Sequence, residues 1–355
     1  MQKAASLKDV ARLAGVSTAT VTRVLHNNGY VGEETRARVT SALKETGYQL
    51  NVVAQSLRKQ QTRTLGHLLN TITRNPFFAE VALGLEEQAL RHGCNVFIYN
   101  VQASAERERL GVETFIRRRT DGIVFTSPVD PANVELAAKA GIPVVQVDWL
   151  ARADRNAVLV DNEVGAVEAM EHLFALGHRR IGFIGADPAR FRHSADARPS
   201  VAEQRLSAYR KSLAGMGIAA DEALVQIRPY YYSLDERDAA EGHAGMRELL
   251  ALHQRPTAVF ATCDILAAGA LQAVHDAGLR VPDDISVIGF DDTYAARLSP
   301  PLTTVALPMR EIGERAADLV FRHMPAPSDA ATDADIVTLP SRLAIRASTA
   351  APGSP

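Results

Sequence analysis

The first 25 residues constrain the fold most, because they carry the start and stop signals of two short helices. Ser6, followed three residues later by Asp9, is a close relative of the capping box and predicts a helix that begins at Leu7. Gly15 supplies the residue that a tight helix exit needs, and Ser17 can cap a second helix. Two short helices joined by a glycine-containing turn form a helix-turn-helix, a motif whose second helix enters the major groove of DNA.

The two faces of the predicted second helix differ in chemistry. One side is an apolar stripe that consists of Val16, Val21, Val24 and Leu25. The opposite side is short and polar, with Thr18, Ala19, Thr22 and Arg23. We interpret Thr18, Ala19 and Arg23 as residues that face base edges. An ordinary pair of surface helices would show the same two faces, so a second observation has to decide between these interpretations.

The charge distribution supplies that second observation. Residues 1–63 contain ten basic and four acidic side chains, a local net charge of +6, although the formal charge of the whole chain is −2. A basic segment attached to an acidic body is typical of a DNA-binding headpiece. Side chains that could donate hydrogen bonds to phosphates are Ser6, Ser17, Thr20, Thr22 and Thr35.

A third helix and a linker are expected to follow. Glu33 and Glu34 suit the first turn of a helix that stops at Gly47, which completes an all-α headpiece over residues 1–50. Residues 51–63 form the linker. Its segment 51–58 begins with Asn51, a good N-cap, but spans only about two turns, too few to hold a helix alone in water. We therefore expect a linker that becomes helical only when docked.

The hydrophobic period changes at Thr64, where short apolar strands begin to alternate with helical stretches. The alternation runs through the strand at 144–148 and starts again at Ile181. It predicts two α/β lobes with parallel sheets over residues 64–345 and a cleft between them, beyond the carboxyl ends of the strands. Residues 346–355 are expected to form a C-terminal tail, frayed from Ala350 onward.

Bulk properties exclude several classes of protein. No apolar run approaches the length of a membrane span, and the N-terminus lacks the apolar core of a signal peptide, so the simplest location is the bacterial cytoplasm. The two cysteines, Cys94 and Cys263, provide neither a disulfide framework nor metal-ligand spacing. The common nucleotide-binding, hydrolase and zinc-protease motifs are missing from the sequence, so we expect no enzyme, no cofactor and no metal.

The chain resembles the lactose-repressor (LacI/GalR) family of bacterial transcription regulators over almost its whole length. The segments that carry the resemblance occur in the family's order: SLKDVARLAGVSTATVTRVLHNNGYVGEETRARV, VDNEVGAVEAMEHLFALGHRRIGFIG, RPTAVFA, GLRVPDDISVIGFDD and PPLTTVALP. The resemblance implies a helix-turn-helix headpiece and a two-lobed body like that of periplasmic binding proteins. It also implies a homodimer that binds a near-palindromic operator, usually as a repressor, under the control of a small-molecule effector.

The same resemblance assigns roles to the linker. The family's linker forms a hinge helix paired across the dimer, whose leucine wedges into the minor groove. Leu57 stands at that leucine, and Arg58 stands where some members place a basic minor-groove reader. Leu50 replaces the proline that many members have before Asn51, which alters the geometry at the start of the hinge. The segment after Phe290, including a helix at 310–323, is expected to cross back to the first lobe.

Candidate effector contacts lie at predicted strand ends. By the family's motif positions, Arg205 and Asp291 are the first candidates and Asp148 the next, because a carboxylate can accept two hydroxyl hydrogen bonds of a sugar. The expected walls are Phe77, Phe78, Trp149 and one of Tyr230–Tyr232, for which we take Tyr231. Cys263 replaces the family's frequent asparagine, so this pocket should lose one hydroxyl contact and gain apolar volume.

Some of these residues have structural alternatives. Phe77 or Phe78 could belong to the core, and Asp161 could cap a helix. Asp264 and Asp292 are better explained as partners of loop backbone groups. Arg190, Arg192 and Arg198 in the loop at 186–204 could favour an anionic ligand, although solvated loop charges explain them better.

The sequence thus predicts a transcription regulator whose effector is a sugar or a sugar acid. Three alternatives stay open: a solute-binding protein with no DNA role, a regulator with a purine-type co-repressor, and a sugar-modifying enzyme of similar architecture. The basic headpiece and the absence of a secretion signal argue against the first, and the absence of catalytic motifs argues against the last.

Overall fold

The structure is a computed structural model that describes residues 5–48, 61–73, 75–150, 154–188, 199–229, 238–324 and 334–353. It divides into two compact units, the headpiece at Met1–Thr62 and the body at Arg63–Pro355. No helix among the described residues is long and apolar enough to cross a membrane.

The described part of the headpiece, residues 5–48, contains three helices that begin and end where the sequence predicts. They are α1 (Leu7–Ala14), α2 (Thr18–Leu25) and α3 (Glu33–Thr46). The capping box is confirmed, because the Ser6 hydroxyl accepts a hydrogen bond from the Asp9 amide and the Asp9 carboxylate accepts one from the Ser6 amide. Gly15 ends α1 in the left-handed conformation, with φ = 64°. The core of this unit is centred on the fully buried Val10, Val21 and Val39.

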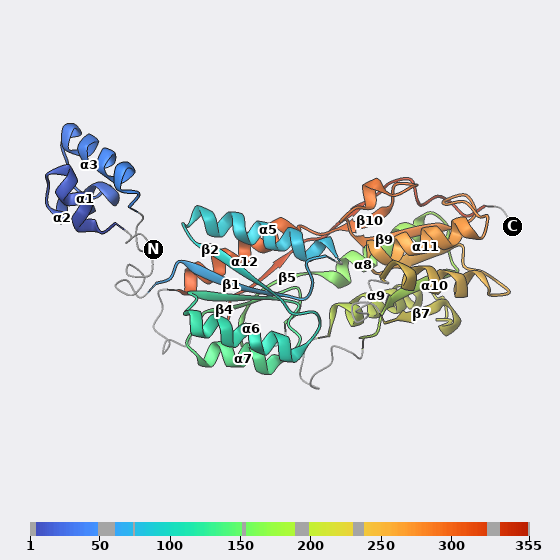
Figure 1. Cartoon of the computed structure of the whole chain (residues 1–355). Coiled ribbons are helices and arrows are strands. Elements are labelled where there is room, and N and C mark those ends of the chain that lie inside the picture. The colour runs from blue at the N-terminus through green and yellow to red at the C-terminus, as the bar shows by residue number, and fades with distance from the viewer. Residues whose placement is uncertain are drawn as a thin grey trace. The chain divides into compact units, whose positions relative to one another are not determined.

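The body contains two six-stranded sheets of matching topology (Figure 1). The first has the strand order β11-β5-β4-β3-β1-β2 and the second β12-β10-β9-β8-β6-β7. The strands of the first sheet are β1 (Thr64–Leu69), β2 (Asn95–Asn100), β3 (Gly122–Thr126), β4 (Val144–Val147), β5 (Asn156–Val160) and β11 (Ile336–Leu339). Those of the second are β6 (Ile181–Ala186), β7 (Val225–Arg228), β8 (Ala258–Ala261), β9 (Ser286–Asp291), β10 (Thr303–Ala306) and β12 (Arg342–Ala344). Two α/β lobes are therefore confirmed, with parallel strand pairs throughout except for β12, which pairs antiparallel with β10.

Helices cover both faces of each sheet. In the first lobe, α5 and α12 lie on one face and α6 and α7 on the other (Figure 1). The helices of the first lobe are α5 (Pro76–Arg91), α6 (Ala105–Arg118), α7 (Pro131–Lys139) and α12 (Met309–His323). Those of the second are α8 (Asn162–Ala175), α9 (Val201–Gly215), α10 (Asp238–Leu250) and α11 (Asp264–Asp276), with short 3-10 turns at Glu222–Leu224 and Ala295–Arg297.

One apolar core is shared by both lobes. It includes Leu85 of α5 and Ile312 of α12 in the first lobe, and also Met170 of α8 and Tyr209 of α9 in the second. The opposite faces are covered by separate clusters, one under α6 and α7 and the other under α10 and α11. The lobes are therefore joined through the layer that contains α5, α12, α8 and α9.

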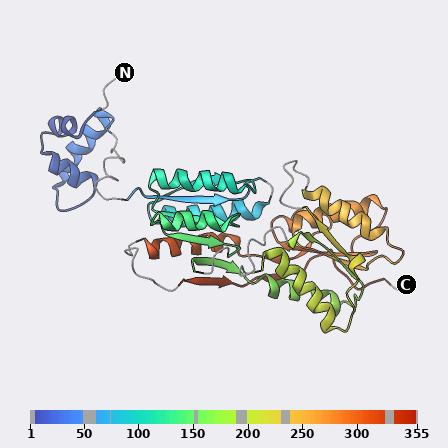
Figure 2. The same ribbon diagram turned by 90° about the horizontal axis from the view of Figure 1, so that it is seen from below.

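The chain crosses between the lobes three times, and the expected return to the first lobe after Phe290 is confirmed at α12. Strand β10 still pairs with β9 in the second sheet, and only then does the chain pass to α12 in the first lobe. Strand β11 pairs with β5, and the red β11 arrow lies beside the green strands in Figure 2. Strand β12 then returns to the second sheet and pairs antiparallel with β10. When an edge strand comes from a distant segment of the chain, little in the local sequence indicates which sheet it will join.

The expected frayed tail is also corrected. The hydroxyl of Ser348 donates to the carbonyl of Val287 and accepts from the Thr303 amide, so this residue is built into the second sheet. The amide of Ala350 donates to Ser286, and the Ala350 carbonyl lies 2.8 Å from Nε2 of His178. Residues 346–350 therefore belong to the second lobe, because its backbone groups find partners there.

Candidate DNA-binding surface and effector site

Three of the four residues on the polar face of α2 are exposed. Thr18, Ala19 and Arg23 are exposed, whereas Thr20 and Thr22 are half-buried. The Ser17 hydroxyl accepts a hydrogen bond from the Thr20 amide at 3.1 Å, which fixes the start of the helix. A small, exposed and partly cationic helix face of this kind fits the major groove.

The other residues predicted to contact DNA differ in their exposure and in the hydrogen bonds that their side chains already make. The Ser6 hydroxyl donates to the Asp9 carboxylate at 2.6 Å, so it is engaged within its own capping box. Thr35 is half-buried in the first turn of α3. Asn51, Leu57 and Arg58 lie outside the described residues. All of these DNA contacts stay predictions.

A pocket lies between the two sheets of the body, with walls from both lobes. The space inside it is about 720 Å³, including the open mouth. First-lobe residues around it are Asn70, Phe77, Phe78, Ser127, Pro128, Asp148 and Trp149, and second-lobe residues are Ala186, Ser200, Val201, Ala202, Arg205, Thr262 and Asp291, with Leu307 at a crossover. Most of these residues follow the carboxyl ends of parallel strands or begin the next helix, the location at which α/β proteins bind ligands.

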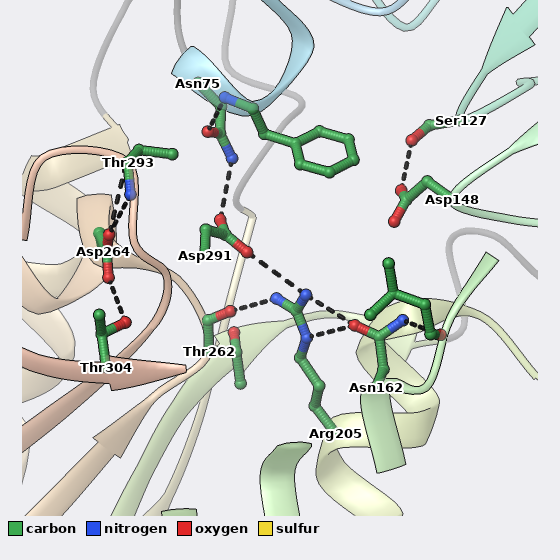
Figure 3. Close-up of polar contacts among 12 residues, drawn as sticks. Asn75, Ser127, Asp148, Asn162, Arg205, Thr262, Asp264, Asp291, Thr293 and Thr304 are labelled. Carbon is green, nitrogen blue, oxygen red and sulfur yellow. Dashed lines mark hydrogen bonds and ion pairs between the residues drawn. The ribbon is translucent and has the colours of Figure 1, made fainter. Parts of the chain in front are cut away.

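Arg205 on α9 organises the second-lobe wall (Figure 3). Its Nε and Nη2 donate to the side-chain oxygen of Asn162 at 3.1 and 2.8 Å, and Nη1 donates to the carbonyl of Thr262. Nη2 also lies 3.4 Å from Oδ1 of Asp291, and the guanidinium lies 3.7 Å above the ring of Phe290. A guanidinium has five N–H donors, so these four bonds leave one donor on Nη1 without a partner among the described residues. Arg205 thus supports the wall and keeps one N–H that could bind an effector.

Asp291 ends β9 and is almost fully buried at the cleft. Burial raises its pKa to about 6, while Arg205 and a hydrogen bond from Asn75 act in the opposite direction. The Nδ2 of Asn75, at the start of α5 in the first lobe, donates to Oδ2 of Asp291 at 3.2 Å (Figure 3). The carboxylate therefore has partners from both lobes, and its remaining lone pairs could accept a ligand hydroxyl.

Asp148 is the polar group of the first-lobe wall. Its Oδ2 accepts a 2.6 Å hydrogen bond from the Ser127 hydroxyl, and burial raises its pKa. Ser127, Asp148 and Asp291 all have left-handed backbones, with φ of 54°, 72° and 102°. Such conformations cost of the order of 1–3 kcal/mol each for residues other than glycine, and they cluster at ligand sites. The surrounding fold holds all three polar side chains at the cleft in spite of this strain.

Aromatic side chains form the rest of the first-lobe wall. Phe77 and Phe78 pack edge to face, with ring centroids 5.4 Å apart, and both belong to the shared core as well as to the pocket. Trp149, the single tryptophan of the chain, is buried beside Asp148. Phe77 and Phe78 therefore line the pocket, as expected, and are also core residues, as in the alternative.

Three acidic residues at strand ends have structural roles. Asp161 caps α8 by accepting from the Val164 amide, as its alternative has it. Asp292 forms an ion pair with the Arg346 side chain at 2.8 Å, where loop backbone partners were expected. Asp264 is fully buried, and it accepts from the Thr293 amide and the Thr304 hydroxyl, both at 2.7 Å.

The structure does not place Cys263 on the pocket wall. Its side chain is buried in the second-lobe core, and the neighbouring Thr262 lines the pocket instead. The expected apolar volume from Cys263 is therefore not found in this pocket, because Cys263 is the N-cap residue of α11 and its side chain packs into the core beneath that helix. Tyr231, Arg190, Arg192 and Arg198 lie outside the described residues.

Several residues of the site were missed by the sequence reasoning. Asn162 and Asn75 hold Arg205 and Asp291 in place, and Ser127 holds Asp148. A signal existed for Asn75, because an asparagine before a proline marks a helix start. The partnership of Asn162 with Arg205 spans 43 residues, and no local pattern indicates it.

Comparisons with known proteins decide the family. Residues 6–51 match the model of bacterial regulatory proteins of the lacI family, and residues 170–349 match that of a periplasmic binding protein-like domain. The ribose operon repressor of Haemophilus influenzae is 33% identical over 92% of this chain and 93% of its own length. The chain belongs to the LacI family. Its headpiece and two-lobed body are those of a DNA-binding transcription regulator with an effector domain, and relatives of this kind are not enzymes.

Other members of the LacI family show the same extent of similarity. The transcriptional repressor PurR of Mannheimia succiniciproducens is 34% identical over 90% of this chain and 92% of its own. A Lac repressor dimer bound to operator and an anti-inducer is 28% identical, with a TM-score of 0.82 and coverage of 98% and 100%. A complex of the regulator CelR with cellobiose is also 28% identical, with a TM-score of 0.69 and coverage of 97% and 99%.

Proposed function

We propose that this LacI-family protein is a homodimeric repressor whose affinity for a near-palindromic operator is controlled by a neutral sugar in the cleft. The observation that carries the effector assignment is the pocket itself. Polar groups of Arg205, Asp291 and Asp148 line it together with the apolar rings of Phe77, Phe78 and Trp149. Hydroxyl groups of a sugar match these polar groups, and its apolar ring face matches the aromatic side chains.

The charges favour a neutral sugar over a sugar acid. The described lining residues that carry charge are one guanidinium, Arg205, and two carboxyl groups, Asp148 and Asp291. An anionic ligand would meet like charges in a buried site, which costs free energy unless one carboxyl group takes a proton. A neutral polyol avoids that cost and can donate to both carboxylates.

The outer edge of the first sheet supports the homodimer. Strand β2 is an edge strand, and its Phe97 and Ile98 are 42% and 46% exposed. Leu110 on the neighbouring α6 is 45% exposed. An edge strand with exposed apolar side chains needs a cover, and a second copy of the chain related by a two-fold axis provides one. The related Lac repressor structure is a dimer on its operator.

Control of operator affinity requires the effector to discriminate between two states of the protein. An effector that contacts both walls binds the closed cleft more tightly than the open one and shifts the population accordingly. Operator and effector then change each other's affinity by the same factor. We place this activity in the cytoplasm, where the operator DNA is.

The effector assignment is tested by calorimetry on the full-length protein with ribose, cellobiose, an aldonic acid and hypoxanthine. We expect a sugar to bind and to change the affinity for an inverted-repeat duplex in fluorescence anisotropy. Exclusive binding of the aldonic acid or of hypoxanthine would contradict a neutral sugar effector. Failure to prefer any inverted repeat over random DNA, with or without these compounds, would contradict the repressor itself.

The recognition helix is tested by Arg23→Ala. Arg23 is exposed on the polar face of α2, so its loss should relax sequence preference and cost about 1–3 kcal/mol in operator binding. Lys44→Ala near the end of α3 is the control, and it should leave sequence preference unchanged. Equal discrimination between operator and mutated operator by the wild type and the Arg23 variant would show that α2 reads DNA with other residues.

A further inference from the structure

Asn75 connects the two lobes directly at the effector pocket. It is the N-cap residue of α5 in the first lobe, and its Oδ1 accepts a 2.9 Å hydrogen bond from the Phe77 amide. Its Nδ2 donates across the cleft to Oδ2 of Asp291 at the end of β9 in the second lobe. Asn75 is only 1% exposed, so this amide group is shielded from water. One side chain thus links the helix that carries Phe77 and Phe78 to the carboxylate of the opposite wall.

Both partners of this hydrogen bond are held firmly. The cap on α5 fixes the amide plane of Asn75, and Arg205 holds the other oxygen of Asp291, with 3.4 Å between the groups. A hydrogen bond to a carboxylate in a buried site is stronger than one between neutral groups. Opening of the cleft would expose this bond to water and replace it with weaker alternatives.

We propose that Asn75 is a positioning residue that latches the two lobes together through Asp291 and thereby sets how much of the effector-free protein has a closed cleft. This inference rests on the proposed function, because it concerns regulation of the same site. The effector binds the closed cleft, so its apparent affinity scales with the closed fraction. Asn75 therefore acts on effector affinity through Asp291, without having to touch the effector.

The test uses Trp149, whose position makes it a reporter. It is the only tryptophan, it lines the pocket, and it is 4% exposed with the lobes together. Acrylamide quenching of tryptophan fluorescence in the effector-free, full-length protein therefore measures opening of the cleft. Asn75→Ser retains an N-cap side chain but is too short to reach Asp291. We expect the ratio of closed to open protein to fall roughly tenfold and quenching to rise.

A second variant separates the latch from a general loss of packing. Asn75→Asp retains the cap and the side-chain length but places a second carboxylate against Asp291, in a site that Asp148, Asp264 and Arg205 also influence. At pH 7.5 we expect it to open the cleft further than Asn75→Ser. At pH 5 the two carboxyl groups can share a proton, so quenching of this variant should fall back towards the wild type. The serine variant should show no such recovery.

Ser104→Ala is the matched control, because it removes the N-cap of α6 in the same lobe without contact with the pocket. It should leave acrylamide quenching unchanged. Equal quenching of the wild type and both Asn75 variants would overturn the latch, as would an Asn75→Asp variant with no response to pH. A wild type that binds no tested sugar would contradict the proposed effector only, since the quenching measurement needs no ligand.

Discussion

The two lobes of the body share one strand order but present different walls to the cleft. Each sheet places the first strand of its run second from an edge, and each is completed by a strand from the end of the chain. The second lobe contributes a network of Arg205, Asn162 and Asp291 that is satisfied before any ligand arrives. The first lobe contributes aromatic rings and the hydrogen-bonded pair of Asp148 with Ser127. The same architecture thus gives one wall built on a charged hydrogen-bond network and one wall rich in aromatic rings.

The lobes also differ in where their helices pack most closely. Close contacts at glycine join α5 and α12 in the first lobe, where a Cβ on Gly84 would overlap the carbonyl of Arg310. In the second lobe they join α10 and α11, where a Cβ on Gly242 would overlap the carbonyl of Leu266. The first pair lies in the layer that contains the shared core, and the second lies on the opposite face. The closely packed helix pair therefore lies near the crossovers in the first lobe and away from them in the second lobe.

The largest expected effect comes from removing the centre of the charged wall. Arg205→Ala leaves Asp291 and Asn162 buried without their main partner, so we expect a loss of about 3–5 kcal/mol in the free energy of unfolding, measured in urea. Effector binding in calorimetry should be lost as well. Arg210→Ala on the same helix breaks an exposed ion pair with Glu222 and should cost less than about 1 kcal/mol. Similar losses in the two variants would mean that the second-lobe wall is not a preorganised network.

Smaller effects are expected at the helix contacts. Gly84→Ala and Gly242→Ala each force two backbones apart, which should cost about 1–3 kcal/mol in urea denaturation. Gly84→Ala should also change effector affinity, because α5 carries Phe77 and Phe78. Gly242→Ala, in the layer outside the shared core, should not.

Gly215→Ala serves as the control for helix propensity in these measurements. A Cβ at Gly215 in α9 would meet open space, so this variant should gain about 0.5 kcal/mol in stability. A loss of stability at Gly215 equal to that at Gly84 would contradict the close approach of helices as the cause of the losses at Gly84 and Gly242, because a Cβ at Gly215 overlaps no neighbour.

The smallest effect concerns pH. Burial and the nearby Asp291 raise the pKa of Asp264 to about 7, well above the value of about 4 in an unfolded chain. The folded protein therefore holds an extra proton between about pH 4 and 7, and the stabilisation from this group is lost as the pH rises through that window. Asp264→Asn should accordingly become more stable relative to the wild type as the pH rises from 4 to 7.

Asp221→Asn should change stability with pH in the opposite direction. Asp221 is a surface residue whose pKa is lowered by a hydrogen bond from Arg180, so its contribution is present at neutral pH and lost as the pH falls. This variant should lose stability relative to the wild type as the pH rises. Equal slopes for the two variants would show that Asp264 is not held protonated by its buried environment.

Local signals predicted the headpiece well. Ser6, Gly15, Ser17 and Gly47 fixed the helix boundaries, because caps and left-handed exits involve residues within one turn of each other. The candidates Arg205, Asp291 and Asp148 were found through the family resemblance, and strand ends are recognisable in the sequence. The supporting residues Asn75, Asn162 and Ser127 were not found, since their partners lie 21 to 216 residues away.

The sequence alone determined which segments form helices and strands, the basic charge of the headpiece and the division of the body into two α/β lobes. These follow from hydrophobic periodicity, helix capping and charge within short stretches of the chain. Three features came from the tertiary structure alone. Strand β11 completes the first sheet and β12 the second, and the C-terminal segment is docked on the second lobe. Asn75 binds Asp291 across the cleft. The physical reason is that these contacts join segments that are far apart in the chain and are brought together by three crossings between the lobes. A contact between distant segments produces no periodic pattern in the sequence of either segment.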